Sequence, residues 1–254
     1  TDLIKKNKII VGVVAYDKIN NQSYEIFGKV VINATGVFSD SIIKMDNPKS
    51  KKLIKASQGV HIVLDKKFLA GPHAIMVPQT SDGRVLFAVP WNENVIVGTT
   101  DTEIETIDDE PQALDKEINF ILQNAGQYMT RRPKRSDIKS VFSGLRPLAA
   151  PKDKNEPTKE ISRHHKILVS ESGLVSALGG KWTTYRKMSE DIINTAIPIA
   201  GLPERNCITQ NLPIHGFDFN FKERFGSYPQ SIMKFQYVND DLRKVCNIIN
   251  KAVY

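Results

Sequence analysis

The chain has 254 residues, with 35 Lys and Arg against 28 Asp and Glu, so its formal net charge is +7. Hydrophobic residues make up 41% and charged residues 25%, a globular balance that argues against a disordered chain. No apolar stretch approaches the ~18 residues that a membrane-spanning helix requires. The basic excess fits a nucleic acid, an anionic membrane or an anionic substrate, and charge alone does not choose among them.

The first 48 residues predict strands and one short helix. Residues 8–16 are rich in β-branched side chains, and residues 23–27 alternate after a polar turn, so a β-hairpin is expected. The continuous apolar run at 30–32 predicts a strand buried on both faces. It ends in the small residues Ala34, Thr35 and Gly36, where a ligand can approach the backbone closely. A short helix is expected at 38–45.

The next block, up to residue 142, has a different pattern. Four short apolar runs at 59–64, 74–78, 84–91 and 94–100 predict an antiparallel sheet with one covered face. Residues 99–102 after the last run are interpreted as a turn cap. An amphipathic helix is expected at 114–128, because its apolar residues fall on one side: Leu114, Ile118, Ile121, Leu122 and Ala125.

The third block predicts strands at 138–142, 166–170 and 174–178, then a helix at 183–197 that ends at Pro198 and Gly201. The composition shifts after Cys207, and a helical pattern at 240–253 indicates the beginning of a separate helical piece. The two cysteines, at 207 and 246, cannot form a disulfide framework, which indicates a reducing compartment.

The strand–Gly–Gly–helix arrangement at 174–197 is suited to holding an anion. The first N–H groups of a helix are unpaired and carry partial positive charge, and Lys181 adds a full charge beside Gly179 and Gly180. A tight turn without any ligand is an equally good interpretation.

Three further side chains are candidates for chemistry. Arg146 lies in an apolar stretch, which predicts a half-buried guanidinium that needs an anion, either a ligand or a carboxylate of the fold. Arg163 precedes two adjacent histidines that point to opposite faces of a strand, so no metal site is expected. His61, inside an apolar strand, is either a core histidine or a proton acceptor near neutral pH. The motifs of serine hydrolases, zinc enzymes and P-loop proteins do not occur.

Six segments in this order resemble the FAD-dependent glycerol-3-phosphate dehydrogenase family, over residues 8–215. The most specific is Gly-Gly-Lys-Trp-Thr-Thr-Tyr-Arg at 179–186, because Ala-Thr-Gly is shared by many flavoproteins. The others are Asn-Ala-Thr-Gly at 33–36, Gly-Val-His-Ile-Val at 59–63, Thr-Ser-Asp-Gly-Arg at 80–84, Val-Gly-Thr-Thr-Asp-Thr at 97–102 and Ser-Gly-Leu-Arg-Pro-Leu at 143–148.

The resemblance implies an α/β fold with α+β character. Residues 1–48 would be part of a Rossmann-like FAD-binding domain, and residues 49–142 an antiparallel-sheet substrate domain. Residues 143–206 would return to the substrate and FAD-binding part with a flavin-contacting helix, and residues 207–254 would begin a helical C-terminal domain. The family's Gly-x-Gly-x-x-Gly turn for the FAD pyrophosphate does not occur in this sequence. A fragment that is colourless or weakly yellow is therefore expected.

The resemblance also implies roles for individual residues. Arg146 and Arg163 would hold the substrate phosphate, Lys181 would lie beside flavin and substrate, and His61 would remove the C2 hydroxyl proton. The cofactor would be contacted by Lys181 and by Ala34, Thr35, Gly36, Gly144, Gly180, Trp182 and Thr183. Backbone groups of Trp182 and Thr183 would stabilise negative charge on the reduced ring.

The implied activity is oxidation of sn-glycerol 3-phosphate to dihydroxyacetone phosphate, with hydride transfer to FAD and electrons passed to quinone. Only 16 residues separate Arg146 from Arg163, whereas the family's oxidases carry an insertion there, so quinone is favoured over oxygen. We expect a cytoplasmic protein lying peripherally on the anionic cytoplasmic membrane, without nucleic acid as a partner. The alternatives are another FAD-dependent amine or hydroxy-acid oxidase, or a non-catalytic phosphate-binding module.

Overall fold

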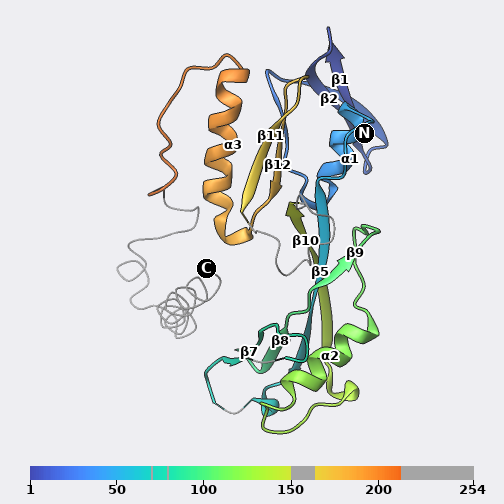
Figure 1. Cartoon of the computed structure of the whole chain (residues 1–254), viewed down its shortest axis with the longest axis vertical. Helices are drawn as coiled ribbons and strands as arrows, with labels where there is room; N and C mark the ends of the chain where they lie inside the picture. The colour runs from blue at the N-terminus through green and yellow to red at the C-terminus, as the bar shows by residue number, and fades with distance from the viewer. Residues whose placement is uncertain (70, 79, 150–163, 213–254) are drawn as a thin grey trace. The chain divides into compact units, whose positions relative to one another are not determined.

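A computed structural model of the chain describes residues 1–69, 71–78, 80–149 and 164–212 (Figure 1). Contacts divide the chain into two units, Thr1–Asn206 and Cys207–Tyr254. The architecture below is that of the first unit. The helical pattern at 240–253 lies outside the described residues.

The N-terminal strands form an antiparallel sheet of three strands, β1 (Asp2–Lys6), β2 (Ile9–Asp17) and β3 (Gln22–Phe27). The hairpin predicted from the alternating pattern is confirmed by the pairing of β2 with β3. Strand β1 was not expected, because its polar and lysine-rich sequence lacks an apolar run; its partner β2 supplies the pairing that makes it a strand.

A second sheet has the order β11 (His165–Val169), β12 (Leu174–Gly179) and β4 (Val31–Asn33). Its central strand β12 is buried along nearly its whole length, as its apolar run predicts, and it pairs parallel to β4. Helices α1 (Ser39–Asp46) and α3 (Tyr185–Ile199) pack against β12. The backbone N–H of Ile10 donates to the carbonyl of Ser172 at 2.9 Å, joining the two sheets.

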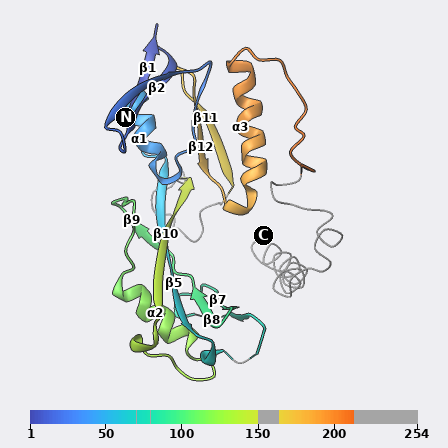
Figure 2. The ribbon, with the colours of Figure 1, turned by 180° about the vertical axis from the view of Figure 1, so that it is seen from behind.

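The largest sheet is antiparallel and contains six strands in the order β10-β5-β8-β7-β6, with β9 also paired to β5. The strands are β5 (Ile54–Asp65), β6 (Ile75–Val77), β7 (Leu86–Trp91), β8 (Asn94–Gly98), β9 (Thr102–Ile104) and β10 (Ser140–Ala149). The long strands β5 and β10 run side by side, and the end of β10 contacts β12 (Figures 1 and 2). Strand β10 continues well past the predicted end at residue 142.

Helix α2 (Asp115–Ala125) covers one face of this sheet, as expected from its amphipathic pattern. The core beneath it is built mainly from alternate residues of the strands and from one side of the helix: Val60, Ile62, Leu64, Leu86, Ala88, Val95, Val97, Ile121 and Ala125. The predicted α/β class, with its antiparallel sheet covered on one face, is confirmed.

Candidate functional site

The register of β5 and β10 gathers the predicted substrate residues on the face opposite to α2. In an antiparallel pair, residues directly opposite each other have their side chains on the same face. His61 lies opposite Phe142, and Ser57 lies opposite Arg146. The core residues of β5 occupy the intervening positions, so His61 and Arg146 share the face that α2 does not cover.

On this face, Arg146 and His61 each pack directly against the backbone of a glycine. A Cβ atom added to Gly59 would lie 2.3 Å from Nη2 of Arg146, and one added to Gly98 would lie 2.2 Å from Cδ2 of His61. Each polar side chain therefore rests directly on a glycine backbone. A Cβ added to Gly144, which lies opposite Gly59 on β10, would meet no atom within 4 Å. The space above Gly144 is open to a ligand.

Arg146 is half-buried, as its apolar sequence context predicts. Its Nη1 donates to the carbonyl oxygen of Thr100 at 3.1 Å, and its Nη2 donates to Oγ1 of Thr99 at 3.0 Å. Because a guanidinium is planar, these two bonds together fix the orientation of its donors. From the sequence, residues 99–102 were interpreted only as a turn cap. That Thr99 and Thr100 hold Arg146 was not predicted.

His61 is half-buried, and its imidazole stacks on the ring of Phe142 with centroids 5.0 Å apart and planes 11° from parallel. Burial lowers the pKa of His61 below its ordinary value of 6.5, and the positive charge of Arg146 lowers this pKa further. The imidazole is therefore neutral near neutral pH and can accept a proton.

The predicted cofactor residues 34–36 follow strand β4, where a buried amide organises the chain. Nδ2 of Asn33 donates to the carbonyl of Ser39 at 3.0 Å, and its Oδ1 accepts the hydroxyl of Thr35 at 2.7 Å. Gly36 has a φ of +60°, which a residue with a side chain rarely adopts. The short turn Gly36–Phe38 packs against β10 and β5.

Residues 180–183 follow β12 at the same edge of the sheet as residues 34–36, because β4 and β12 are parallel neighbours. Gly179 and Gly180 have φ values of +72° and +89°. The φ of Gly180 lies in the region that favours glycine, and a Cβ there would also lie 2.5 Å from Sδ of Met188. The carboxyl ends of parallel strands are where ligands bind in open α/β sheets.

The short 3-10 turn Trp182–Thr184, which leads into helix α3, presents backbone donors. The first hydrogen bond of the helical segment runs from the N–H of Thr184 to the carbonyl of Lys181 at 3.0 Å. The N–H groups of Trp182 and Thr183 come before this first bonded turn, in the position where a helix leaves its donors to other acceptors. Trp182 is 88% exposed and its ring lies 6.0 Å from that of Tyr185. Exposed donors at a helix N-terminus, beside an exposed aromatic ring and Lys181, fit the electron-rich edge of a flavin.

The predicted site residues thus form two described groups. His61, Gly144 and Arg146 share the face of the largest sheet that α2 leaves uncovered, while 34–36 and 180–183 follow the carboxyl ends of the parallel strands β4 and β12. Arg163 lies outside the described residues.

Within the described part of the chain, no group of three or more His, Cys, Asp or Glu could hold a metal ion. No helix there is long and apolar enough to cross a bilayer.

Glu117, a buried carboxylate on α2, was not among the residues predicted from the sequence. It is 2% exposed and accepts hydrogen bonds from Gln58, Thr100, Thr102 and the backbone of Leu114. One signal was available in the sequence. Glu117 lies three residues after Leu114 and four before Ile121, which puts a charge on the apolar side of the predicted helix.

Comparison with known proteins identifies the family. A family model described as FAD dependent oxidoreductase matches residues 1–186. The probable mitochondrial glycerol-3-phosphate dehydrogenase of Dictyostelium discoideum is 38% identical over 231 residues, which cover 85% of this chain and 36% of that protein. The mitochondrial glycerol-3-phosphate dehydrogenase of Arabidopsis thaliana is 41% identical over 211 residues, which cover 82% of this chain and 33% of that protein.

A solved structure agrees with the sequence matches. The glycerol-3-phosphate dehydrogenase from Bacillus halodurans complexed with FAD matches with a TM-score of 0.70 and 33% identity, over 81% of this chain and 39% of that chain. This chain spans about a third of the length of the curated relatives named above. The family match covers most of the chain and includes both groups of candidate site residues. The chain belongs to the family of FAD dependent oxidoreductases.

Proposed function

We propose that the protein oxidises sn-glycerol 3-phosphate to dihydroxyacetone phosphate with FAD as the hydride acceptor. The observation that carries this proposal is that Arg146 and His61 lie on the same face of one sheet, each against the backbone of a glycine. The identities of 38% and 41% to glycerol-3-phosphate dehydrogenases support the choice of substrate.

Arg146 binds the phosphate of the substrate. A guanidinium held by Thr99 and Thr100 offers oriented donors, and charge-assisted hydrogen bonds to a phosphate are stronger than neutral ones. Arg163 would be the second guanidinium for the phosphate dianion, by the family resemblance. Gly144 keeps the space beside Arg146 free for the body of the substrate.

His61 accepts the proton of the C2 hydroxyl. As the O–H bond breaks, its electron pair forms the new carbonyl, and the hydrogen on C2 leaves with the electrons of the C–H bond as a hydride. FAD, when bound, supplies the acceptor for this hydride. Phe142 keeps the imidazole plane in place through the stacked contact.

The cofactor is proposed to contact Ala34, Thr35, Gly36, Gly144, Gly180, Lys181, Trp182 and Thr183. The small residues after β4 allow close approach. The helical turn that begins at Trp182 and Thr183, together with the ammonium of Lys181, would hold the cofactor where backbone donors and a positive charge favour an electron-rich ring. By the family resemblance, Lys181 contacts both the substrate and the cofactor, and it is the second catalytic candidate beside His61.

Quinone is the electron acceptor that we propose, at the surface of an anionic membrane. The short spacing between Arg146 and Arg163 and the net charge of +7 support this part of the proposal. Because the named relatives are mitochondrial proteins, a mitochondrial membrane is the alternative to the cytoplasmic membrane.

The test is reduction of the bound flavin in the full-length protein under anaerobic conditions. Addition of sn-glycerol 3-phosphate should bleach the oxidised flavin, while glycerol at the same concentration should bleach it far more slowly. A flavin that stays oxidised with glycerol 3-phosphate but is reduced by an amine or a 2-hydroxy acid would replace this function with that of another oxidase.

A further inference from the structure

Glu117 is a buried carboxylate whose oxygens each accept two hydrogen bonds. Oε1 accepts the hydroxyls of Thr100 at 2.9 Å and Thr102 at 2.6 Å. Oε2 accepts Nε2 of Gln58 at 2.7 Å and the backbone N–H of Leu114 at 2.9 Å. Burying a carboxylate is costly unless it is bonded in this way. Such a group in the core therefore calls for an explanation beyond packing.

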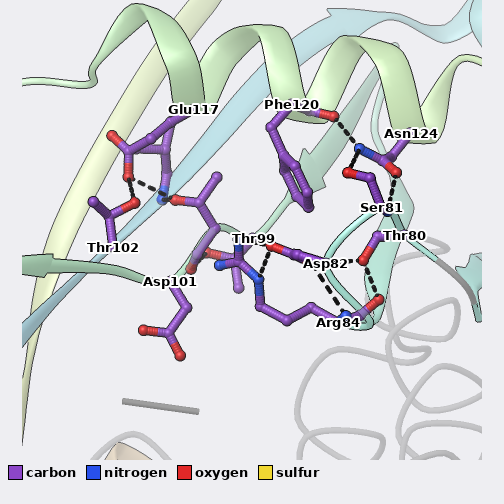
Figure 3. Close-up of polar contacts among 12 residues, drawn as sticks. Thr80, Ser81, Asp82, Arg84, Thr99, Asp101, Thr102, Glu117, Phe120 and Asn124 are labelled. Carbon is purple, nitrogen blue, oxygen red and sulfur yellow. Dashed lines mark hydrogen bonds and ion pairs between the residues drawn. The ribbon is translucent and has the colours of Figure 1, made fainter. Parts of the chain in front are cut away.

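Thr100 connects this carboxylate to the opposite side of the sheet. Its side chain is buried, donates to Glu117 and accepts the backbone N–H of Val60 at 2.9 Å. Its carbonyl oxygen accepts Nη1 of Arg146 at 3.1 Å. The same residue thus holds Glu117 with its hydroxyl and Arg146 with its carbonyl. Figure 3 shows Glu117 at one end of α2 beside Thr102, with Thr99 and Asp101 in the adjoining segment.

Glu117 accepts all four of its hydrogen bonds, and this fixes their direction. A carboxylate only accepts, so the Thr100 hydroxyl must give its proton to Glu117 and keep a lone pair for Val60. An amide in place of the carboxylate breaks this arrangement in either orientation. With its NH2 at the Oε2 position it faces the N–H of Leu114, and with its NH2 at the Oε1 position it deprives the Thr100 proton of its acceptor.

We propose that Glu117 is a positioning residue for Arg146, acting through Thr100 to set the geometry of the phosphate-binding guanidinium. This inference rests on the proposed function, because it assumes that Arg146 binds the phosphate. Glu117 itself lies on the core side of the sheet and does not touch the substrate.

The experiment uses the full-length protein with Glu117→Gln, which keeps the side-chain shape and removes the charge. We expect the KM for glycerol 3-phosphate and the inhibition constant of inorganic phosphate to rise together by about 3- to 30-fold, the usual range for mutations along a coupling network. The rate of flavin reduction at saturating substrate should change less than about twofold, because the reacting atoms are not touched.

Asn124→Asp is the matched control. Asn124 lies on the same helix, is buried, and bonds the backbone N–H of Ser81 at 2.8 Å and the carbonyl of Phe120 at 2.8 Å (Figure 3). Its exchange of amide for carboxylate mirrors Glu117→Gln. The control should lower the melting temperature while leaving both the KM and the phosphate inhibition constant unchanged.

A Glu117→Gln protein with unchanged KM and phosphate inhibition overturns the proposal, and so does an equal rise in the Asn124→Asp control. If Glu117→Gln does not fold, two variants of Thr100 replace it. Thr100→Val removes the hydroxyl that bonds Glu117 and should raise the KM, whereas Thr100→Ser keeps the hydroxyl and should not.

Arg146→Ala is measured in parallel. An unchanged KM there overturns the phosphate role itself, whereas a raised KM there with a normal Glu117→Gln overturns the positioning role alone.

Discussion

The two faces of the largest sheet share the same strands and differ in almost every physical respect. Toward α2, β5 presents Val60, Ile62 and Leu64, which are fully buried in an apolar core. On the other face it presents Gly59 and His61, and its neighbour β10 presents Arg146. Successive side chains of a strand point to opposite faces, so core residues and proposed site residues alternate along β5. Substitutions on the two faces should therefore have different signatures.

The largest expected effect is on stability and comes from the core face. Ile121→Ala removes a fully buried side chain of α2 and should lower the free energy of unfolding by about 2–5 kcal/mol. Denaturant unfolding measures this loss. The KM of the protein that remains folded should not change, and a strongly raised KM would mean that the two faces are not separable.

Gly98→Ala tests the opposite face at the proposed base. The new Cβ would lie 2.2 Å from Cδ2 of His61, so the imidazole must move away from its position on Phe142. We expect flavin reduction at saturating substrate to slow by about 100-fold, since general-base catalysis is worth 10²–10⁴-fold. Stopped-flow absorbance of the flavin gives the rate, and an unaltered rate would remove His61 from the role of base.

Gly59→Ala should give the complementary kinetic signature on the same face. Its Cβ would lie 2.3 Å from Nη2 of Arg146 and would displace the guanidinium. The KM should rise by about tenfold through loss of part of a charge-assisted contact. Steady-state kinetics with glycerol 3-phosphate measure it, and a changed kcat at constant KM would contradict the division of labour between Arg146 and His61.

The smallest effect is the pH dependence set by His61. Its pKa in the folded protein lies below 6.5 because of burial and then of Arg146. The unfolded chain therefore binds more protons below pH 6.5, so the free energy of unfolding should fall as the pH drops from there through the lower folded value. Urea unfolding of wild type and His61→Phe on both sides of pH 6.5 measures the difference. A similar slope in both proteins would assign the effect to other groups.

Within the described residues, local patterns predicted most of the strands and the helices α2 and α3, because alternation and helical spacing are properties of neighbouring residues. They did not predict how β5 pairs with β10, since these strands are far apart in the sequence and the second one was expected to end at residue 142. Pro147 is accepted because β10 is the edge strand of the sheet, where one missing N–H is tolerated.

The candidate site was predictable to the extent that residue type reveals chemistry. A lone arginine in an apolar stretch and a histidine in a strand were recognisable, and the family resemblance supplied their roles. The supporting residues were not, because Thr100 and Glu117 matter through contacts between α2 and the sheet that no local pattern encodes. The positions of Gly59 and Gly98 beneath Arg146 and His61 could not be predicted either, because they depend on the register between strands.

The most direct test of the central claim compares glycerol 3-phosphate with glycerol as reductants of the flavin in wild-type and Arg146→Ala full-length protein. Loss of the phosphate contact should raise the KM for glycerol 3-phosphate by about 10- to 150-fold, equivalent to 1.5–3 kcal/mol, and leave the KM for glycerol unchanged. An unchanged KM for glycerol 3-phosphate, or equal rises for both compounds, would contradict the assignment of the uncovered sheet face as the phosphate-binding site.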